Sequence, residues 1–384
     1  MPNDENPDLH GSYAWSNALR GLYYGPGCME SALPKVIKDT GASRALIVTG
    51  KSLKDKTDVV GRVEAVLRSL DAFGGIFHEI EQHSPIAGIQ RGLQRFRENG
   101  CDLIVAVGGG SHIDASKAIL YFNHKEHGVA ILPQIAIPTT LSAAEYTYVA
   151  GYTNAEGQKV SAIDPGLVPA GIILDAELTL PTPERLWLST GIRALDHAVE
   201  SLYRSFIPPP VKYICQAAIA DLFRYLPQSK ANPRAIDVRQ KLQLASWMSI
   251  WPIQSEKIGM SAFGLSHALG NKLGATYGIP HGMTSCLTLA SVVRLQARIA
   301  SQEDKEWLAN TLIRLQKPPT GSLEGDVSLL GDLIEELVEN LGLKASLLEF
   351  SVPREGLSEI ASKAVEPDDS RMRESVLELL AALY

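Results

Sequence analysis

The chain has 384 residues, of which 45% are hydrophobic and 21% charged, and its formal net charge is −7. These values are typical of a globular protein, and an acidic balance without a long basic run argues against a nucleic acid or anionic membrane partner. Four scattered cysteines, an acidic polar start and no apolar run of transmembrane length predict a cytoplasmic protein without disulfides or a secretory signal peptide.

Short apolar runs alternate with helical patterns through the first half of the chain. Buried strands are predicted over residues 45–49, 75–80, 102–107 and 134–138, with helices between them, as over residues 59–70 and 86–99. Continuous apolar strands separated by helices are typical of a parallel sheet covered by helices on both faces. Residues 1–180 are therefore predicted to form a Rossmann-like α/β domain.

Strand signals almost vanish after the Pro-Thr-Pro sequence at residues 181–183. Helices are predicted over residues 185–205, 210–226, 238–254, 262–275, 283–301, 307–315, 327–341 and 374–383. The second half, residues 181–384, is therefore predicted to be an all-helical domain.

A Gly-Gly-Gly-Ser turn at residues 108–111 joins a predicted strand to a predicted helix. Glycines permit close backbone approach, and a helix N-terminus offers free N–H groups to a phosphate. Taken alone, the turn is equally well explained as a tight turn in which Ser111 caps the helix. A second predicted strand ends at Thr139 and Thr140, and ligands of open α/β sheets bind beyond the carboxyl ends of the strands. The two strand ends together favour a dinucleotide site.

Three histidines, His197, His267 and His281, lie in two patterned segments of the second half. A catalytic transition-metal site takes three or four nitrogen and oxygen ligands, and these imidazoles would supply three. Arg193 lies one helical turn before His197, on the same face of the helix. At about 5 Å and an effective dielectric of about 20, its charge would repel a divalent ion by roughly 6–7 kcal/mol. Either Arg193 turns away from a bound metal, or no metal binds and the guanidinium itself acts on the substrate. Any one of these histidines alone is better explained as a hydrogen-bonded core residue.

The order and spacing of these segments resemble the iron-containing alcohol dehydrogenase superfamily, which has a dehydroquinate-synthase-like fold. The resemblance covers essentially the whole chain and rests on residues 24–27, the glycine turn with Asp114 and Lys117, and residues 138–140, 191–200, 267 and 280–282. The segment Pro-Thr-Thr-Leu-Ser-Ala-Ala-Glu at residues 138–145 most resembles the maleylacetate-reductase branch, whose members reduce without needing a metal. The resemblance implies an oxidoreductase that uses NADPH or NADH and forms a homodimer.

The resemblance also implies roles for individual residues. The nucleotide-binding set falls on Gly50, Ser52, Gly109, Gly110, Ser111, Asp114, Thr139, Thr140, Ser142 and Lys159. The catalytic set falls on Arg193, His197, His267, His281 and Asn271, with Arg193 in place of the metal aspartate and Asn271 in place of a histidine tied to proton transfer. Gly50 replaces the acidic residue that favours NAD, so a 2′-phosphate is expected to be tolerated.

The sequence thus predicts an NAD(P)H-dependent, metal-independent reductase of a carbonyl or activated C=C bond in a small substrate, whose carboxylate Arg193 would bind. If a metal is retained, iron or zinc would be held by His197, His267 and His281. The alternative is a non-redox isomerase, dehydratase or cyclase, for example one of specialised biosynthesis, that uses these histidines for acid–base chemistry. An inactive binding protein is disfavoured because all three histidines remain.

Overall fold

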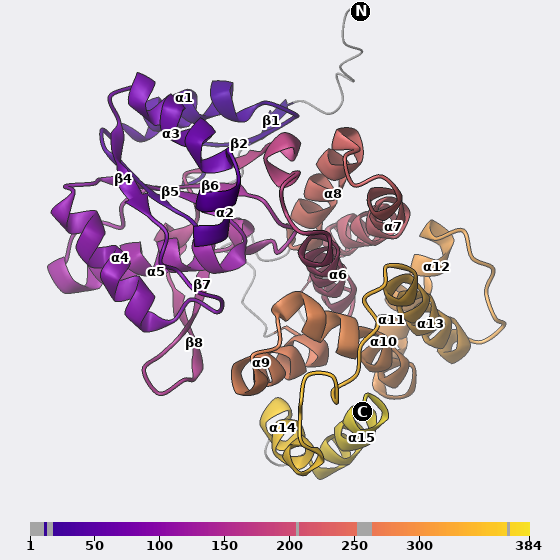
Figure 1. Cartoon of the computed structure of the whole chain (residues 1–384). Coiled ribbons are helices and arrows are strands. Elements are labelled where there is room, and N and C mark those ends of the chain that lie inside the picture. The colour runs from indigo at the N-terminus through magenta and orange to yellow at the C-terminus, as the bar shows by residue number, and fades with distance from the viewer. Residues whose placement is uncertain (1–10, 14–17, 205–206, 252–262, 367–368) are drawn as a thin grey trace, which may run out of the picture. The chain divides into compact units, whose positions relative to one another are not determined.

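The computed structural model describes residues 11–13, 18–204, 207–251, 263–366 and 369–384 (Figure 1). The chain divides into two compact units. The first comprises Met1–Thr182 with Arg234–Leu244, and the second Pro183–Pro233 with Ala245–Tyr384. Among the described residues, no helix combines the length and apolar character needed to span a bilayer. Of the four cysteines, Cys101 and Cys215 are buried, whereas Cys28 and Cys286 are partly exposed; all four are free thiols.

A seven-stranded sheet forms the centre of the first unit. Its order is β1 (Gly11–Tyr13), β2 (Gly21–Tyr24), β9 (Gly171–Leu174), β6 (Gln134–Pro138), β5 (Leu103–Gly108), β3 (Ala45–Val48) and β4 (Phe73–Phe77). All neighbouring strands are parallel except β1, which is antiparallel to β2. The predicted parallel α/β architecture is therefore confirmed. A separate antiparallel hairpin contains β7 (Val149–Thr153) and β8 (Lys159–Ile163).

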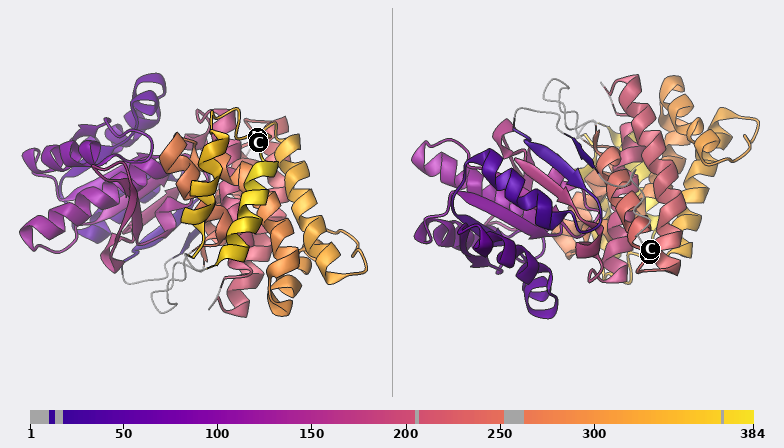
Figure 2. Two further views of the ribbon diagram at one scale, coloured as in Figure 1. Left: turned by 90° about the horizontal axis from the view of Figure 1, so that it is seen from below. Right: turned by 90° about the horizontal axis from the view of Figure 1, so that it is seen from above.

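Helices cover both faces of this sheet, as two further views show (Figure 2). On one face α1 (Met29–Thr40) and α3 (Val59–Ser69) pack against alternate side chains of the strands. On the other face α4 (Ile86–Glu98) and α5 (Gly110–His127) do the same. Because both faces are covered, the central strands are apolar at every position rather than at every second one.

The chain reverses its direction across the sheet between β3 and β5. From β3 it passes through α2 (Lys51–Lys56) and α3 to the edge strand β4, and then returns through α4 to β5 on the other side of β3. Such a reversal opens a crevice beyond the carboxyl ends of the two strands, where ligands of doubly wound sheets bind. Gly50 follows β3 and the Gly-Gly-Gly-Ser turn follows β5, so both lie at this point.

Several elements of the first unit differ from the prediction. The second predicted strand, 75–80, is β4 and begins and ends earlier, because the glycine pair before Ile76 is accepted in an edge strand. The strands β1, β2 and β9 and the hairpin were not predicted, because they are short or contain glycine. Residues 234–244 join this unit because Arg239 Nη1 donates to the Thr179 carbonyl at 2.9 Å and Gln240 Nε2 to the Leu174 carbonyl at 3.0 Å.

The second unit is helical, as predicted. Its helices are α6 (Glu184–Ser201), α7 (Pro209–Ala231), the end of α8 (Ile236–Ser249), α9 (Leu265–Tyr277), α10 (His281–Ile299), α11 (Gln302–Ala309), α12 (Thr311–Arg314), α13 (Leu323–Asn340), α14 (Leu357–Ala364) and α15 (Ser370–Ala382). The single helix predicted over 307–315 is broken at Asn310, and α14 was not predicted. Predicted helical residues 205, 252–254 and 262 lie outside the described part of the chain.

Candidate active site

The glycine turn after β5 packs closely against the loop after β6. A Cβ atom on Gly110 would lie 2.9 Å from Ser142 Oγ, and one on Gly109 would lie 3.1 Å from Thr140 Cγ2. Thr140 Oγ1 in turn donates to Ser142 Oγ at 3.2 Å. The structure therefore brings these four predicted nucleotide residues together, and the missing side chains at 109 and 110 leave the backbone N–H groups of the α5 N-terminus accessible.

Ser111 and Lys159 lie around the backbone of His83, and Asp114 lies beside Gly151 and Lys159. Ser111 does not cap α5, because Gly109 is the residue at the N-cap and no side chain makes the capping bond. Instead, Ser111 Oγ accepts a hydrogen bond from the His83 amide at 3.2 Å, and Lys159 Nζ donates to the His83 carbonyl at 3.3 Å. Thr139 continues from β6, and its amide donates to the Gly108 carbonyl at 3.0 Å. Ser52 lies apart from this group, exposed on α2.

A buried lysine beneath the turn holds the loop in place. Lys117 Nζ donates to the carbonyl oxygens of Ala144 at 2.7 Å, Thr147 at 2.5 Å and Val149 at 3.2 Å. Burial lowers the pKa of Lys117 to about 8, although Asp114 and Glu145 oppose this. Burial likewise raises the pKa of Asp114 to about 6 and that of Glu145 to about 7. The glycine turn therefore rests on a cluster of buried ionisable groups.

The raised pKa of Glu145 predicts a dependence of stability on pH. The folded protein retains this proton up to about pH 7, whereas the unfolded chain releases it near pH 4.5. Stability contributed by the protonated group is therefore lost as pH rises from about 4.5 to 7, by about 3 kcal/mol. We expect Glu145→Gln, which does not titrate, to lack this loss. Urea unfolding of both proteins at intervals from pH 4.5 to 8 measures the difference, and parallel pH profiles would contradict the prediction.

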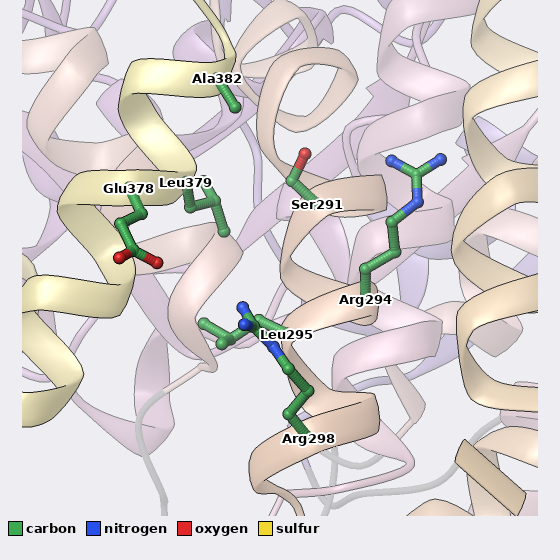
Figure 3. Close-up of a pocket in the computed structure, with 7 residues that line it drawn as sticks. All are labelled: Ser291, Arg294, Leu295, Arg298, Glu378, Leu379 and Ala382. Carbon is green, nitrogen blue, oxygen red and sulfur yellow. The ribbon is translucent and has the colours of Figure 1, made fainter. Parts of the chain in front are cut away.

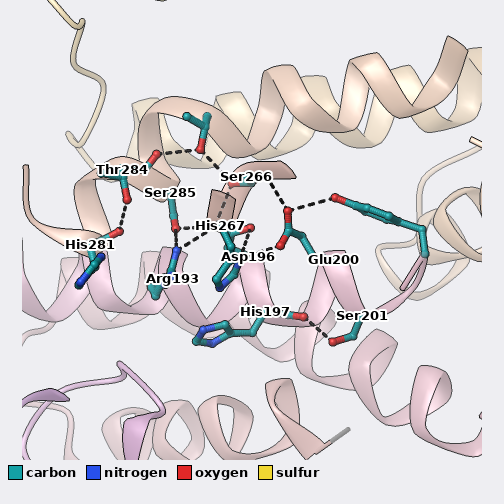
Figure 4. Close-up of polar contacts among 12 residues, drawn as sticks. Arg193, Asp196, His197, Glu200, Ser201, Ser266, His267, His281, Thr284 and Ser285 are labelled. Carbon is teal, nitrogen blue, oxygen red and sulfur yellow. Dashed lines mark hydrogen bonds and ion pairs between the residues drawn. The ribbon is translucent and has the colours of Figure 1, made fainter. Parts of the chain in front are cut away.

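Three helices of the second unit bring together the predicted catalytic residues (Figure 4). Arg193 and His197 lie on α6, His267 on α9, and His281 is the first residue of α10. Glycines allow these helices to approach closely. A Cβ atom on Gly282 of α10 would lie 2.7 Å from the Ser189 backbone of α6.

Arg193 is paired with a carboxylate of its own helix. Its Nη1 lies 3.5 Å from Asp196 Oδ2 and donates to Ser285 Oγ at 3.2 Å. Asp196 is fully buried, and its Oδ2 also accepts hydrogen bonds from Ser285 Oγ at 2.5 Å and Ser266 Oγ at 3.0 Å. Burial alone would raise the pKa of Asp196, but His267, Arg193 and Ser285 outweigh it and hold the pKa below its ordinary value. The guanidinium is thus held in place by an ionised carboxylate.

Glu200 orients the imidazole of His267. Glu200 Oε2 lies 2.6 Å from His267 Nδ1, and Glu200 Oε1 accepts from the Ser266 amide at 2.7 Å and from Tyr203 Oη at 3.3 Å. An acceptor at Nδ1 favours the tautomer in which that nitrogen carries the proton. Nε2 is buried and has no hydrogen-bond partner among the described residues. His267 therefore presents a fixed nitrogen for proton exchange or ligation.

His197 lies beside His267, with ring centroids 4.8 Å apart, and the Phe263 ring stacks on His267 at 4.2 Å. Burial first, and then the neighbouring His267, Arg193 and Arg204, hold the pKa of His197 well below its ordinary value. The ring is therefore neutral near pH 7. His281 also lowers the pKa of His197.

Asn271 is not part of this group. It lies one turn after His267 on α9 and is exposed, and its side chain makes no hydrogen bond within the described ranges. The structure thus places four of the five predicted catalytic residues together.

The donor atoms around Asp196 do not suit a metal ion. Oxygen and nitrogen atoms of Asp196, Glu200 and His267 lie within 4.8 Å of one another. However, the Glu200 oxygens and Asp196 Oδ2 already accept hydrogen bonds, and His267 Nδ1 is engaged with Glu200, which leaves Asp196 Oδ1 as the one oxygen without such a bond. The guanidinium of Arg193 bonds to the same carboxylate. Arg193 also lies close enough to His197 to lower its pKa, so a cation rather than a fourth ligand stands beside that histidine. This charge makes the residues present a poor fit for a divalent cation.

A pocket of about 350 Å³ in the second unit is separate from these residues (Figure 3). It lies between α10 and α15, and Arg298 and Glu378 border it. Arg294 also lines it, but its guanidinium is paired with Asp332 and Glu335. None of its lining residues belongs to the predicted catalytic set.

The partners that orient this site were not predicted from the sequence. They are Glu200, Ser266 and Ser285. Glu200 carried one available signal, because it lies seven residues after Arg193 and so on the same helix face. The two serines lie on other helices, and no periodicity links them to α6.

Comparison with known proteins identifies the family of the chain. Residues 20–176 match the family model "Iron-containing alcohol dehydrogenase", and residues 187–384 match "Fe-containing alcohol dehydrogenase family, C-terminal". The chain is 30% identical to dehydrogenase FUM7 of Gibberella moniliformis, over 85% of this chain and 84% of that protein. It is 29% identical to the maleylacetate reductase of Burkholderia cepacia, over 90% and 89% of the two chains.

The solved structure of sulfoacetaldehyde reductase from Bifidobacterium kashiwanohense in complex with NAD+ has the same fold. It superposes with a TM-score of 0.79 at 24% identity, covering 97% of this chain and 98% of that one. Members of the matched family carry out NAD(P)-dependent oxidoreduction, so the non-redox alternative is not favoured. The chain belongs to the iron-containing alcohol dehydrogenase family and is a dehydrogenase or reductase with the resemblance to maleylacetate reductases that its sequence predicted.

Proposed function

We propose that this protein uses NADPH or NADH to reduce a carbonyl or activated C=C bond in a small substrate that carries a carboxylate, without a divalent metal. The main support for this proposal is the hydrogen bonding of the Arg193 guanidinium. Its Nη1 is held by Asp196 and Ser285, whereas Nε and Nη2 have no partner among the described residues. A guanidinium that is anchored at one nitrogen leaves an edge for bidentate pairing with a carboxylate.

The reaction transfers one hydride from the nicotinamide to the electrophilic carbon and one proton to the developing anion, and it leaves NAD(P)+ and the reduced acid. Negative charge builds on the substrate as the hydride arrives, and a fixed cation beside it stabilises that charge. His267 carries its proton on Nδ1, held by Glu200, so its Nε2 can accept a proton from solvent water and pass it to the substrate anion, and the neutral His197 beside it can take part in the same relay. The protein thus provides a cation and proton carriers from its own side chains.

Relatives support the choice of substrate class. A maleylacetate reductase is among the proteins to which this chain is similar, and maleylacetate is by its name a carboxylic acid. Assays of 2-oxo acids and unsaturated keto acids against matched uncharged ketones, with either coenzyme and an excess of chelator, test the proposal. Activity confined to uncharged substrates, or abolished by chelator and restored by metal, would contradict it. The homodimer and the cytoplasmic location implied earlier remain predictions.

The glycine turn provides a test of the nucleotide site. We expect NADPH or NADH at a hundredfold excess over the dissociation constant to stabilise the protein by roughly 2–3 kcal/mol. Gly110→Val should abolish this effect, because its side chain would meet Ser142 and cover the α5 amides. Gly61→Val is the matched control, since a Cβ at Gly61 meets nothing within 4 Å. Thermal melts measure the shift, and a normal shift in Gly110→Val would show that the nucleotide binds elsewhere.

A further inference from the structure

The imidazole of His112 lies at the point where the chain reverses across the sheet. His112 is the third residue of α5, yet its ring reaches back between the ends of β3 and β5. A Cβ atom on Gly50 would lie 2.6 Å from His112 Nε2, and one on Gly108 would lie 2.8 Å from His112 Nδ1. The ring therefore fills the space that a side chain at residue 50 would need.

This location is where a doubly wound sheet receives the adenosine half of a dinucleotide. The pyrophosphate lies at the N-terminus of the helix after the glycine turn, and the ribose lies beside the end of the neighbouring strand. β3 and β5 are adjacent and parallel, so the end of β3 is that neighbouring position. Gly50, which follows β3, has no side chain that could contact the ribose. The imidazole of His112 lies beside Gly50 and could make this contact instead.

The chemistry of the ring and its surroundings suits an anionic group. His112 Nδ1 is buried and lacks a hydrogen-bond partner in the described part of the chain, and burial lowers the pKa of the ring to about 4. The ring is thus neutral at pH 7, and Nε2, on the side of Gly50, is available as an N–H donor. Lys51 and Ser52 follow Gly50 and are exposed. No carboxylate follows β3 before Asp55.

We propose that His112 sets the coenzyme preference of this protein: its imidazole replaces the missing side chain at residue 50 and donates Nε2–H to the 2′-phosphate of NADPH. The inference rests on the proposed use of NAD(P)H and adds the residue that distinguishes the two coenzymes. A carboxylate introduced at Gly50 would first have to displace this ring. The preference between NADPH and NADH therefore depends on the side chain at residue 112 and not on residue 50 alone.

The first test compares dissociation constants of NADPH and NADH, measured by calorimetry, for the wild type, His112→Ala and His112→Gln. Because a hydrogen bond to a charged group is lost, we expect His112→Ala to weaken NADPH binding about tenfold or more and NADH binding less than about threefold. His112→Gln keeps an N–H donor near the same place and should retain most of the preference. His124→Ala, on the same helix but near its other end, is the matched control and should change neither value.

The second test is a double-mutant cycle that combines Gly50→Ala with His112→Ala. Its conclusion rests on the coupling between the two substitutions and not on the stability of a single variant. Gly50→Ala adds a methyl group against the His112 ring and should weaken NADPH binding in the wild type. In the His112→Ala background the space is free, and the same substitution should have little effect, so the two changes should be strongly non-additive.

The outcomes separate this inference from the proposed function. Loss of the NADPH preference in His112→Ala, its retention in His112→Gln and a non-additive cycle would support the role of His112. If both coenzymes bind and the wild type binds NADH more tightly than NADPH, or the ratio of their dissociation constants changes less than about twofold in His112→Ala, the role of His112 is refuted while the reductase proposal stands. If the wild type binds neither coenzyme, the reductase proposal fails and this inference falls with it.

Discussion

We expect Arg193→Gln to lower kcat/KM for a carboxylate-bearing substrate by about 100-fold to 1,000-fold, because the bidentate, charge-assisted hydrogen bonds to the substrate carboxylate are lost. The glutamine amide keeps a hydrogen-bond donor for Ser285, but it lacks both the positive charge and the two parallel N–H donors of the guanidinium. Arg193→Lys keeps the charge without the planar fork and should recover part of the activity. Steady-state kinetics with one oxo acid and one matched uncharged ketone measures both effects.

Arg185→Gln is the control for this experiment, because Arg185 lies on the same helix but is exposed. Its kinetics should match those of the wild type. If Arg193→Gln loses activity equally on the acid and on the ketone, Arg193 stabilises the reacting oxygen rather than anchoring the carboxylate. Unchanged kinetics on both substrates would remove Arg193 from the reaction.

Arg193→Asp addresses the metal directly. Removing the cation and adding a carboxylate beside His197, His267 and His281 creates a donor set of three nitrogens and one oxygen, which suits zinc or iron. We expect elemental analysis to find little bound metal in the wild type and a rise towards one ion per chain in the variant. Stoichiometric metal in the wild type would contradict the metal-free proposal.

The second large effect is expected at Lys117. Replacing this buried lysine with methionine leaves the carbonyl oxygens of Ala144, Thr147 and Val149 without their shared donor and removes the cation that lies near Asp114 and Glu145. We expect Lys117→Met to reduce the free energy of unfolding by about 3 kcal/mol or more. Coenzyme binding should weaken as well, because the loop that carries Ser142 loses its anchor.

Urea unfolding followed by circular dichroism measures the loss at Lys117. Lys125→Met provides the matched control, since Lys125 lies on the same helix and is exposed. A loss of similar size in both variants would mean that the effect comes from the helix surface rather than from the buried contacts.

The sequence was sufficient to predict the elements whose pattern is local. Strands β3, β5 and β6 are continuous apolar runs followed by glycine or threonine turns, so their type and approximate bounds follow from the residues themselves. The long helices of the second unit were predicted for the same reason. Elements that depend on distant partners were not predicted. The strand β2 is only four residues long, and it forms because β9, 150 residues later in the chain, pairs with it.

The site shows the same division between local and distant information. The histidines and Arg193 are recognisable in the sequence because their spacing and order match those of a known family. Their charge and orientation cannot be recognised in the sequence. Arg193 is paired with Asp196 and held by Ser285 of another helix, and the tautomer of His267 depends on Glu200. His112 has no pattern that marks it, and its ring reaches Gly50 because two strands far apart in sequence end side by side. Residue types and spacing thus specified which groups are available, whereas packing between distant segments assigned their charge, orientation and partners.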